Sequence, residues 1–227
     1  MASGIKIAID GPAASGKSTT ARRLAQKLGY IYIDTGAMYR AATLAVLQEN
    51  VDIHNEQAVL ACVKKHRISI QAQADGQHTF LDDQDVTHLL RSSAINRTIS
   101  LISSYPEVRR VMVDQQRRLA QKGGVVMDGR DIGTVVLPDA DLKVFMVASI
   151  KERARRRLAE LKEQGEQVTL EQVEEEIRRR DRLDATRSEA PLKKAEDARE
   201  LDTSRLTIDQ QVEIIYNWAK EIIAKNR

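Results

Sequence analysis

The sequence predicts an α/β fold in which helices cover a central parallel sheet. Three observations support this prediction. Short strand-like runs alternate with longer helical patterns along the chain. The strand-like runs are rich in β-branched residues, as expected of buried parallel strands. The first of them leads into a glycine-rich turn and then into a helix, which is the arrangement from which parallel sheets are built.

The predicted elements follow one another in a regular order. A strand over residues 5–10 precedes the glycine-rich turn, and a helix over residues 19–28 follows it. A second strand over residues 30–34 leads to a helix whose apolar positions are Met38, Ala41, Leu44 and Leu47. Later strands are predicted at 125–127, at 142–147 and near Leu201, with an Arg-rich helix after residue 147 and a last helix over 208–224.

Two segments interrupt this alternation. Residues 67–88 contain two alternating runs separated by Ala74-Asp75-Gly76, and an Asp-Gly pair between such runs predicts a β-hairpin. A small antiparallel sheet is therefore expected as an insertion. The second interruption, Gln164-Gly165-Glu166, separates two Arg-rich helical segments and predicts the hinge of a mobile lid.

Length and composition limit the classes of protein that fit. A chain of 227 residues can hold one α/β domain with insertions, and its net charge of +3 suits an anionic partner without choosing one. The 4% aromatic content argues mildly against single-stranded nucleic acid as the main ligand. The single Cys62 has apolar neighbours and is predicted to be a buried small side chain in a reducing compartment. No apolar run is long enough to cross a bilayer and no signal peptide is visible, so we expect a cytoplasmic protein.

The segment Gly11-Pro-Ala-Ala-Ser-Gly-Lys17-Ser18 matches the P-loop pattern G-x-x-x-x-G-K-[ST] in full. Backbone N–H groups of such a loop, at a helix N-terminus, bind phosphate oxygens. We expect Lys17 to reach the β- and γ-phosphates of a nucleoside triphosphate and Ser18 to ligate Mg²⁺. The alternative is an ordinary glycine-rich turn with a surface lysine, but the flanking strand and helix favour phosphate binding.

A triphosphate site does not by itself predict a kinase. Switch GTPases also need a guanine-reading N-K-x-D segment, which this sequence lacks, and large mechanical ATPases have longer chains. A small transferase remains, and it needs an acceptor site. Arg40 and Arg130 lie in turns that follow predicted strands, where ligands gather in parallel sheets. Either arginine alone could be a surface residue, but together they predict a second anion site.

Four segments, taken in order, resemble bacterial cytidylate kinases. They are the P-loop, Asp34-Thr-Gly-Ala-Met-Tyr-Arg40, Asp128-Gly-Arg-Asp-Ile-Gly-Thr134 and Arg180-Asp-Arg-Leu-Asp-Ala-Thr-Arg187. The resemblance extends over nearly the whole chain and includes the inserted small sheet. It implies a P-loop three-layer fold and an enzyme that transfers the γ-phosphate of ATP to CMP, and also to dCMP, with Mg²⁺ as cofactor.

The resemblance also implies a division into three domains. The core P-loop domain would comprise residues 1–34, 111–149 and 186–227. A monophosphate-binding domain would cover residues 35–110, and a helical lid residues 150–185.

Roles for individual residues follow from the same resemblance. The ATP site is implied at Gly11, Pro12, Ala13, Ala14, Ser15, Gly16, Lys17, Ser18 and Thr19, with lid contacts from Arg156 and Arg157. The catalytic residues would be Lys17 and the phosphate clamps Arg40, Arg130 and Arg187. Ser100, Arg109 and Asp131 would contact the cytosine, with Thr35 close by, and Asp184 with Arg180 the ribose. From the residues alone, the simpler readings are favoured: Ser100 as a solvent-facing or back-bonded helix serine, Arg109 as a surface charge and Asp184 as one half of an ion pair.

Two other functions stay open on the sequence. The chain could phosphorylate another nucleoside monophosphate or a small hydroxyl-bearing metabolite. It could instead be a nucleic-acid-stimulated ATPase that uses its Arg-rich helices, although glutamates interleave those arginines as on a solvated helix face. We expect ATP and CMP as partners, no nucleic acid, no membrane, and a monomer. The histidines, His54, His66, His78 and His88, show no spacing typical of zinc or of a catalytic triad and are expected at the surface.

Overall fold

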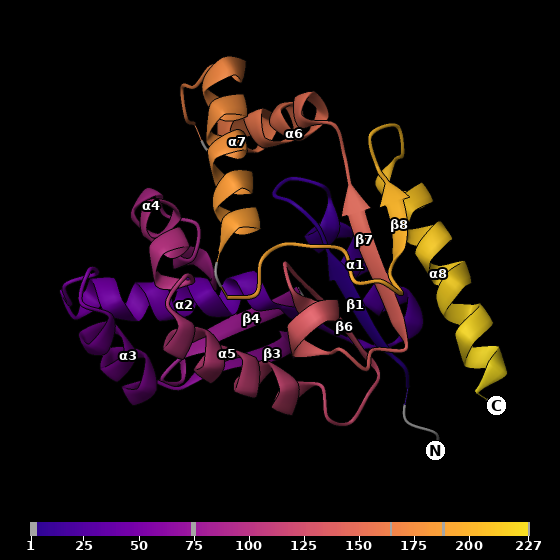
Figure 1. Cartoon of the computed structure of the whole chain (residues 1–227), viewed down its shortest axis with the longest axis horizontal. Coiled ribbons are helices and arrows are strands. Elements are labelled where there is room, and N and C mark those ends of the chain that lie inside the picture. Colours follow the sequence, from indigo (N-terminus) through magenta and orange to yellow (C-terminus); the bar gives the residue numbers. More distant parts are fainter. Residues whose placement is uncertain (1–3, 74–75, 164, 188, 227) are drawn as a thin grey trace. The chain divides into compact units, whose positions relative to one another are not determined.

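The computed structural model describes residues 4–73, 76–163, 165–187 and 189–226. The chain forms two compact units (Figure 1). The first comprises Met1–Tyr30 and Gly123–Arg227, and the second comprises Ile31–Lys122. Each unit has its own sheet, which is parallel in the first and antiparallel in the second. The predicted α/β class with a central parallel sheet is therefore confirmed.

Four parallel strands form the sheet of the first unit, in the order β6-β1-β7-β8. They are β1 (Lys6–Asp10), β6 (Val125–Gly129), β7 (Leu142–Val147) and β8 (Arg199–Asp202). Central strand β1 pairs Ile7 with Val126 on one side and with Leu142 on the other. Every residue of β6 is buried, as expected of a strand covered on both faces. The carboxyl ends of β1 and β6 thus meet at one edge of the sheet, the edge where ligands gather in open α/β sheets.

Two long helices pack together beside this sheet. α1 (Lys17–Leu28) begins directly after the glycine-rich turn, and α8 (Ile208–Lys225) ends the described chain next to it (Figure 1). Thr20 of α1 donates a buried hydrogen bond of 2.7 Å to Gln211 of α8. A third, short helix follows β6 and was not predicted: Ile132–Val136 forms a π-helix, a form that is often found at functional sites.

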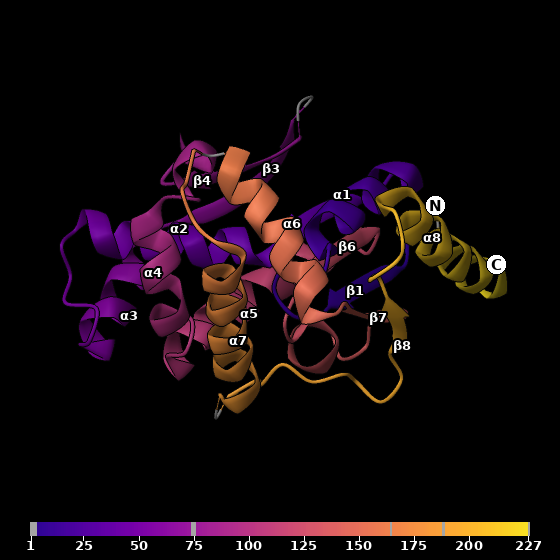
Figure 2. The same ribbon diagram turned by 90° about the horizontal axis from the view of Figure 1, so that it is seen from above.

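The two Arg-rich segments are helices α6 (Ile150–Glu163) and α7 (Leu170–Thr186), which pack against each other (Figure 2). Their contact is a small apolar cluster formed by Ala154, Leu161, Val173 and Ile177. Thr169 begins α7 with a capping box, in which its side chain and that of Gln172 each accept a backbone N–H. Gln164 of the predicted hinge lies outside the described residues, and the neighbouring Gly165 has a positive φ of 80°. The lid over residues 150–185 stays a prediction.

The second unit is mainly helical around a small sheet. Its elements are β2 (Ile31–Asp34), α2 (Thr35–Gln48), α3 (Glu56–Lys65), β3 (Ile68–Gln73), β4 (Gly76–Leu81), β5 (Gln84–Asp85), a 3₁₀ turn (Thr87–Leu89), α4 (Ser93–Ile102) and α5 (Pro106–Leu119). The antiparallel pairing of β3 with β4 confirms the predicted hairpin, although Ala74 and Asp75 of its turn lie outside the described residues. Strand β5 was not predicted, because it is only two residues long.

The units differ in their limits from the three domains expected from the resemblance. The second unit begins at Ile31 and ends at Lys122, so it includes β2 and the whole of α5. The three-domain division remains a prediction. Among the described helices, none combines the length and the apolar character that crossing a bilayer requires.

We expect Gly11→Ala to destabilise the protein more than Gly29→Ala. Both glycines have positive φ, 147° and 68°, so alanine is strained at either position. A Cβ on Gly11 would also lie 2.1 Å from the carbonyl oxygen of Met146 in β7, whereas a Cβ on Gly29 would meet no described atom within 4 Å apart from its own neighbours along the chain. Gly29→Ala should lower the free energy of unfolding by about 1 to 2 kcal/mol, and Gly11→Ala by more, as measured by urea denaturation. Equal losses would mean that β7 moves without cost.

Candidate functional site

The glycine-rich turn between β1 and α1 lies at the N-terminus of α1 and contains residues in left-handed conformations. Gly16, which precedes α1, has a φ of 94°, and Ala14 also adopts a left-handed conformation with a φ of 58°. No side chain of the described residues caps α1, so the first N–H groups of the helix are not bonded to a capping side chain. Backbone N–H groups arranged in this way bind phosphate oxygens, helped by the helix dipole.

Lys17 is the first residue of α1 and is almost fully buried, with 5% of its surface exposed. Its ammonium group donates to the Pro12 carbonyl oxygen at 2.7 Å and to Ser15 Oγ at 3.3 Å. Burial lowers the pKa of Lys17 well below its usual value, and the nearby Arg130 lowers it further, whereas Asp128 and Asp10 act in the opposite direction. The site therefore concentrates positive charge in a place where an anion would be stabilised.

Asp10 is the last residue of β1, and its buried carboxylate holds the segment that follows β6. It accepts the N–H of Ile132 at 2.8 Å and that of Gly133 at 2.7 Å. These bonds fix the backbone directly after Arg130 and Asp131, two predicted site residues. Burial raises the pKa of Asp10 to about 6, against the effect of the two hydrogen bonds. This role of Asp10 was not predicted, because the two hydrogen bonds join residues that are 122 and 123 positions apart in the sequence.

Ser18 and Asp128 form the part of the site that suits a metal ion. Ser18 Oγ donates to Asp128 Oδ2 at 2.8 Å, so a hydroxyl and a carboxylate oxygen meet at the start of α1. Oxygen ligands of this kind are the ones that Mg²⁺ takes in P-loop proteins, from a loop serine and a strand-end aspartate. Ser18 was predicted as a ligand. Asp128 was missed, although an aspartate directly after Val125-Val-Met127 is a signal that could have identified it.

A half-buried cluster brings together three of the predicted residues. Arg130 Nε donates to Asp184 Oδ2 at 2.9 Å, and Arg187 Nη2 lies 3.6 Å from Asp184 Oδ1. Although burial alone would raise it, the Arg130 guanidinium, with those of Arg187 and Arg180, keeps the pKa of Asp184 below its ordinary value. The end of β6 and the C-terminal end of α7 thus contribute one network of charges. In this structure Asp184 is an ion-pair partner, as one reading of the sequence allowed.

Arginines of α6 hold the P-loop by its carbonyl groups. Arg156 donates to the Ser15 carbonyl oxygen at 3.3 Å and to the Thr203 carbonyl oxygen at 2.7 Å. Arg153, 6% exposed, donates to the Ala13 carbonyl oxygen at 3.2 Å and to Asp181 of α7 at 2.7 Å. Arg153 was predicted only as part of an Arg-rich helix, because its burial could not be inferred from an Arg-rich run.

The two arginines predicted to contact ATP differ in their surroundings. Arg156 is engaged by the P-loop backbone and by Glu152, at 3.1 Å from its Nε. Arg157 donates to Glu160 at 2.9 Å on the same helix. The predicted contacts of both side chains with the triphosphate stay predictions.

The remaining predicted residues belong to the second unit. Thr35 is the buried first residue of α2, Arg40 lies one turn further along, and Ser100 lies in α4. Arg109 of α5 is 5% exposed; it donates to the Ser103 carbonyl oxygen at 3.1 Å, and its guanidinium carbon lies 5.5 Å from the centre of the Tyr39 ring. The alternative that Arg109 is a surface charge is therefore wrong. A buried, stacked guanidinium has a fixed orientation, which suits the recognition of a planar polar group.

Comparisons with known proteins agree on one family. A family model described as cytidylate kinase matches residues 7–221. A cytidylate kinase of Geobacillus sp. (strain WCH70) is 50% identical over 223 residues, which is 98% of this chain and 100% of that protein. One of Bacillus cereus (strain ATCC 10987 / NRS 248) is 51% identical over 221 residues, covering 97% of this chain and 98% of that protein. Among solved structures, an uncharacterized protein from Eubacterium ventriosum ATCC 27560 is alike in fold, with a TM-score of 0.53 at 12% identity over 95% of this chain and 98% of that one.

Replacing Asp10 by asparagine should change how stability depends on pH. With a pKa of 3.8 in the unfolded chain and about 6 in the folded one, Asp10 holds a proton in the folded protein that it has lost in the unfolded chain between these values. Its contribution is therefore present below about pH 4 and is lost as the pH rises through about 6. Relative to Asp10→Asn, the wild type should lose up to about 3 kcal/mol between pH 4 and pH 7.

Urea denaturation of both proteins at a series of pH values measures this difference. Asp141→Asn is the matched control, because Asp141 accepts the N–H of Lys6 at 2.7 Å from an exposed position. That variant reports the loss of the charge of a carboxylate that accepts a backbone N–H without being buried. A pH-independent difference between the wild type and Asp10→Asn would mean that Asp10 is ionised throughout.

Proposed function

Because the chain belongs to the cytidylate kinase family, we propose that it transfers the γ-phosphoryl group of ATP to CMP, and also to dCMP. The observation that carries the proposal is the family match over residues 7–221, together with a P-loop whose lysine is buried at the start of α1. In this reaction an oxygen of the CMP phosphate attacks the γ-phosphorus, and ADP leaves as the bond to its β-phosphate oxygen breaks. The products are CDP and ADP.

The P-loop would bind the triphosphate. Residues 11–19 would surround the phosphates with backbone N–H groups, and Lys17 would exchange its bonds to Pro12 and Ser15 for bonds to the β- and γ-phosphates. Since burial lowers the pKa of Lys17, the negative charge of the triphosphate would oppose this shift and favour the charged form of the lysine. Binding and protonation would thus support each other.

Ser18 and Asp128 fit a magnesium site, since their oxygens already lie 2.8 Å apart beside the loop. When bound, Mg²⁺ supplies neutralisation of the charge on the β- and γ-phosphate oxygens. Ser18 would then turn its hydroxyl oxygen toward the ion instead of donating to Asp128. The two side chains would hold the ion directly or through its water ligands.

The transfer itself requires alignment more than covalent chemistry. A loose, in-line transition state carries charge on the oxygens of the moving phosphoryl group, and Arg40, Arg130 and Arg187 would stabilise that charge. Arg156 and Arg157 would contact the triphosphate from the helix pair α6–α7. The acceptor phosphate needs no protein base, because its second pKa is about 6 and the dianion is already the nucleophile at neutral pH.

The acceptor nucleotide would be identified by polar contacts at both of its ends. Arg109, Asp131 and Ser100 would bind the polar edge of the cytosine, with Thr35 close by. The burial of Arg109 supports this role, since a buried polar group left unpaired by the wrong base imposes a large penalty. Asp184 and Arg180 would bind the ribose hydroxyl groups.

Lys17→Ala is expected to lower kcat for CMP phosphorylation by about 100- to 1,000-fold, because it removes a hydrogen-bond donor to the transferred phosphoryl group in the transition state. Lys27→Ala, in the same helix but ion-paired with Glu213 at the surface, should retain normal turnover and serves as the control. Both variants are checked for folding by circular dichroism. A folded Lys17→Ala protein with wild-type turnover would remove the basis of the proposal.

The wild type should be assayed with ATP and Mg²⁺ against CMP, dCMP, UMP, AMP and GMP. The proposal expects the highest kcat/KM with CMP or dCMP. A preference for another monophosphate would identify a related kinase of different specificity. ATP turnover that rises with DNA or RNA, and not with any monophosphate, would instead indicate a nucleic-acid-stimulated ATPase.

Asp184→Asn should reduce kcat/KM for CMP about tenfold more than for dCMP. Only CMP carries a 2′-hydroxyl, which would donate a hydrogen bond to the charged carboxylate. Asp181→Asn is the control on the same helix, since Asp181 pairs with Arg153 and has no proposed ribose contact. That variant should affect the two substrates equally. Equal losses in Asp184→Asn would leave its carboxylate with the ion-pair role toward Arg130 alone.

A further inference from the structure

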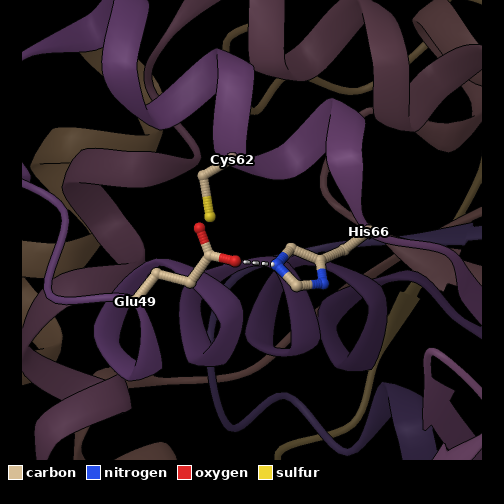
Figure 3. A group of neighbouring side chains, drawn as sticks. All are labelled: Glu49, Cys62 and His66. Carbon is tan, nitrogen blue, oxygen red and sulfur yellow. Dashed lines mark hydrogen bonds and ion pairs between the residues drawn. The ribbon is translucent and has the colours of Figure 1, made fainter.

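Three side chains with metal-binding atoms meet in the second unit, and none of them is among the residues predicted to contact a nucleotide. They are Glu49, directly after α2, Cys62 in α3, and His66, directly after α3. One carboxylate oxygen, the Cys62 sulfur and one imidazole nitrogen all lie within 4.8 Å of one another. Figure 3 shows the Glu49 carboxylate between the thiol and the imidazole ring.

The geometry of the cluster is close to that of a metal site. Glu49 Oε1 lies 2.9 Å from His66 Nε2. In a tetrahedral zinc site, with metal–ligand bonds of about 2.0 to 2.3 Å, the ligand atoms lie about 3.3 to 3.8 Å from one another. The Glu49–His66 separation is shorter than this and the other separations reach at most 4.8 Å, so the Glu49 and His66 side chains would turn to place an ion among the three ligands.

A further residue orients the imidazole. The Nδ1 atom of His66 makes a close contact with the carboxylate of Asp82, so the opposite nitrogen, Nε2, faces Glu49. Metal-binding histidines are held in this way, with the other ring nitrogen donating to a carboxylate. Asp82 has a φ of 48° and also accepts the N–H of Arg67 at 2.8 Å, so its own position is fixed by the backbone.

The chemistry of the ligands selects the class of ion. Thiolate and imidazole ligands favour late first-row transition metals over Mg²⁺ and Ca²⁺. We propose that Glu49, Cys62 and His66 bind a divalent transition-metal ion, with Zn²⁺ the best fit, and that a water molecule takes the fourth position. The ion would join the C-terminal end of α2 to α3.

Metal-free, the same residues form an ion-pair network. Lys65 Nζ lies 2.5 Å from Glu49 Oε1, and hydrogen bonds to Asp82 and Glu49 raise the pKa of His66. Burial, together with Glu49, raises the pKa of the Cys62 thiol to about 11. A dication would replace the proton on Cys62 Sγ, which would pass to solvent, and it would bind His66 through an unprotonated Nε2. Lys65, whose side chain is 66% exposed, could turn away into water.

Titration of the full-length protein with Co²⁺, in a buffer with a phosphine reductant, tests the proposal. Wild-type protein should bind one Co²⁺ with a sulfur-to-cobalt charge-transfer band in the near ultraviolet and visible bands typical of tetrahedral cobalt, and Zn²⁺ should abolish both. Cys62→Ser should lose the charge-transfer band. Glu49→Gln and His66→Gln should bind at least about tenfold more weakly, and so should Asp82→Asn.

His78→Gln is the matched control. His78 Nδ1 pairs with Asp85 at 2.5 Å in the same unit, so it repeats the imidazole–carboxylate pair, but it is not part of the cluster of possible ligands. This variant should bind Co²⁺ as the wild type does. No charge-transfer band in the wild type, or an unchanged band in Cys62→Ser, would overturn the proposal.

Two further measurements on the wild type make the test independent of any variant that fails to fold. Saturating Zn²⁺ should raise the Tm, because the ion binds only the folded arrangement. It should also slow the alkylation of Cys62 by a maleimide. Alkylation at the same rate with and without Zn²⁺ would show that the thiol is not a ligand.

Discussion

The burial of the Lys17 ammonium group is the constraint on which the arrangement of the charges around it depends. A lysine so well removed from water would lose its proton if no anions lay nearby. Asp128 and Asp10 oppose that loss, while Arg130 favours it, and Asp184 in turn neutralises part of the charge of Arg130. Carboxylates thus offset part, but not all, of the positive charge around Lys17. A bound polyanion shifts this balance toward the charged form of the lysine, so the site favours anions through its own electrostatics.

Two aspartates at the ends of neighbouring strands, Asp10 and Asp128, have different roles in the site. Asp10 and Asp128 end β1 and β6, which are paired so that Ile9 lies opposite Asp128 and Asp10 opposite Gly129. Parallel pairing brings both to the same edge of the sheet. Asp10 is turned toward backbone N–H groups and fixes the segment after β6, whereas Asp128 meets a hydroxyl of the P-loop. The difference in partners, not in residue type, separates a structural carboxylate from one that can serve a metal ion.

Local patterns were enough to predict the strand, turn and helix around Gly11–Ser18, because every interaction that defines them lies within a few residues. They also predicted the β3–β4 hairpin and the buried Cys62. The roles of Asp10 and Asp128 escaped prediction because their partners lie more than 100 residues away. His66 was expected at the surface, with no spacing typical of zinc ligands. Its contact with Glu49 escaped prediction because Glu49 lies 17 positions before it in the sequence, a spacing that matches no zinc motif. Neither the π-helix nor the burial of Arg153 leaves a periodic signal.

The attachment of α6 to the P-loop uses main-chain atoms on the loop side. Arg153 and Arg156 donate to the carbonyl oxygens of Ala13 and Ser15, and Thr203 also donates to Ser15, at 2.9 Å. Every amino acid supplies such an oxygen, so substitutions that keep the backbone course of the loop would leave the attachment in place. Substitution of Ala13 would therefore keep this contact, whereas substitution of Arg153 or Arg156 would remove it. The helix therefore constrains the path of the loop without constraining the identity of the residues along it.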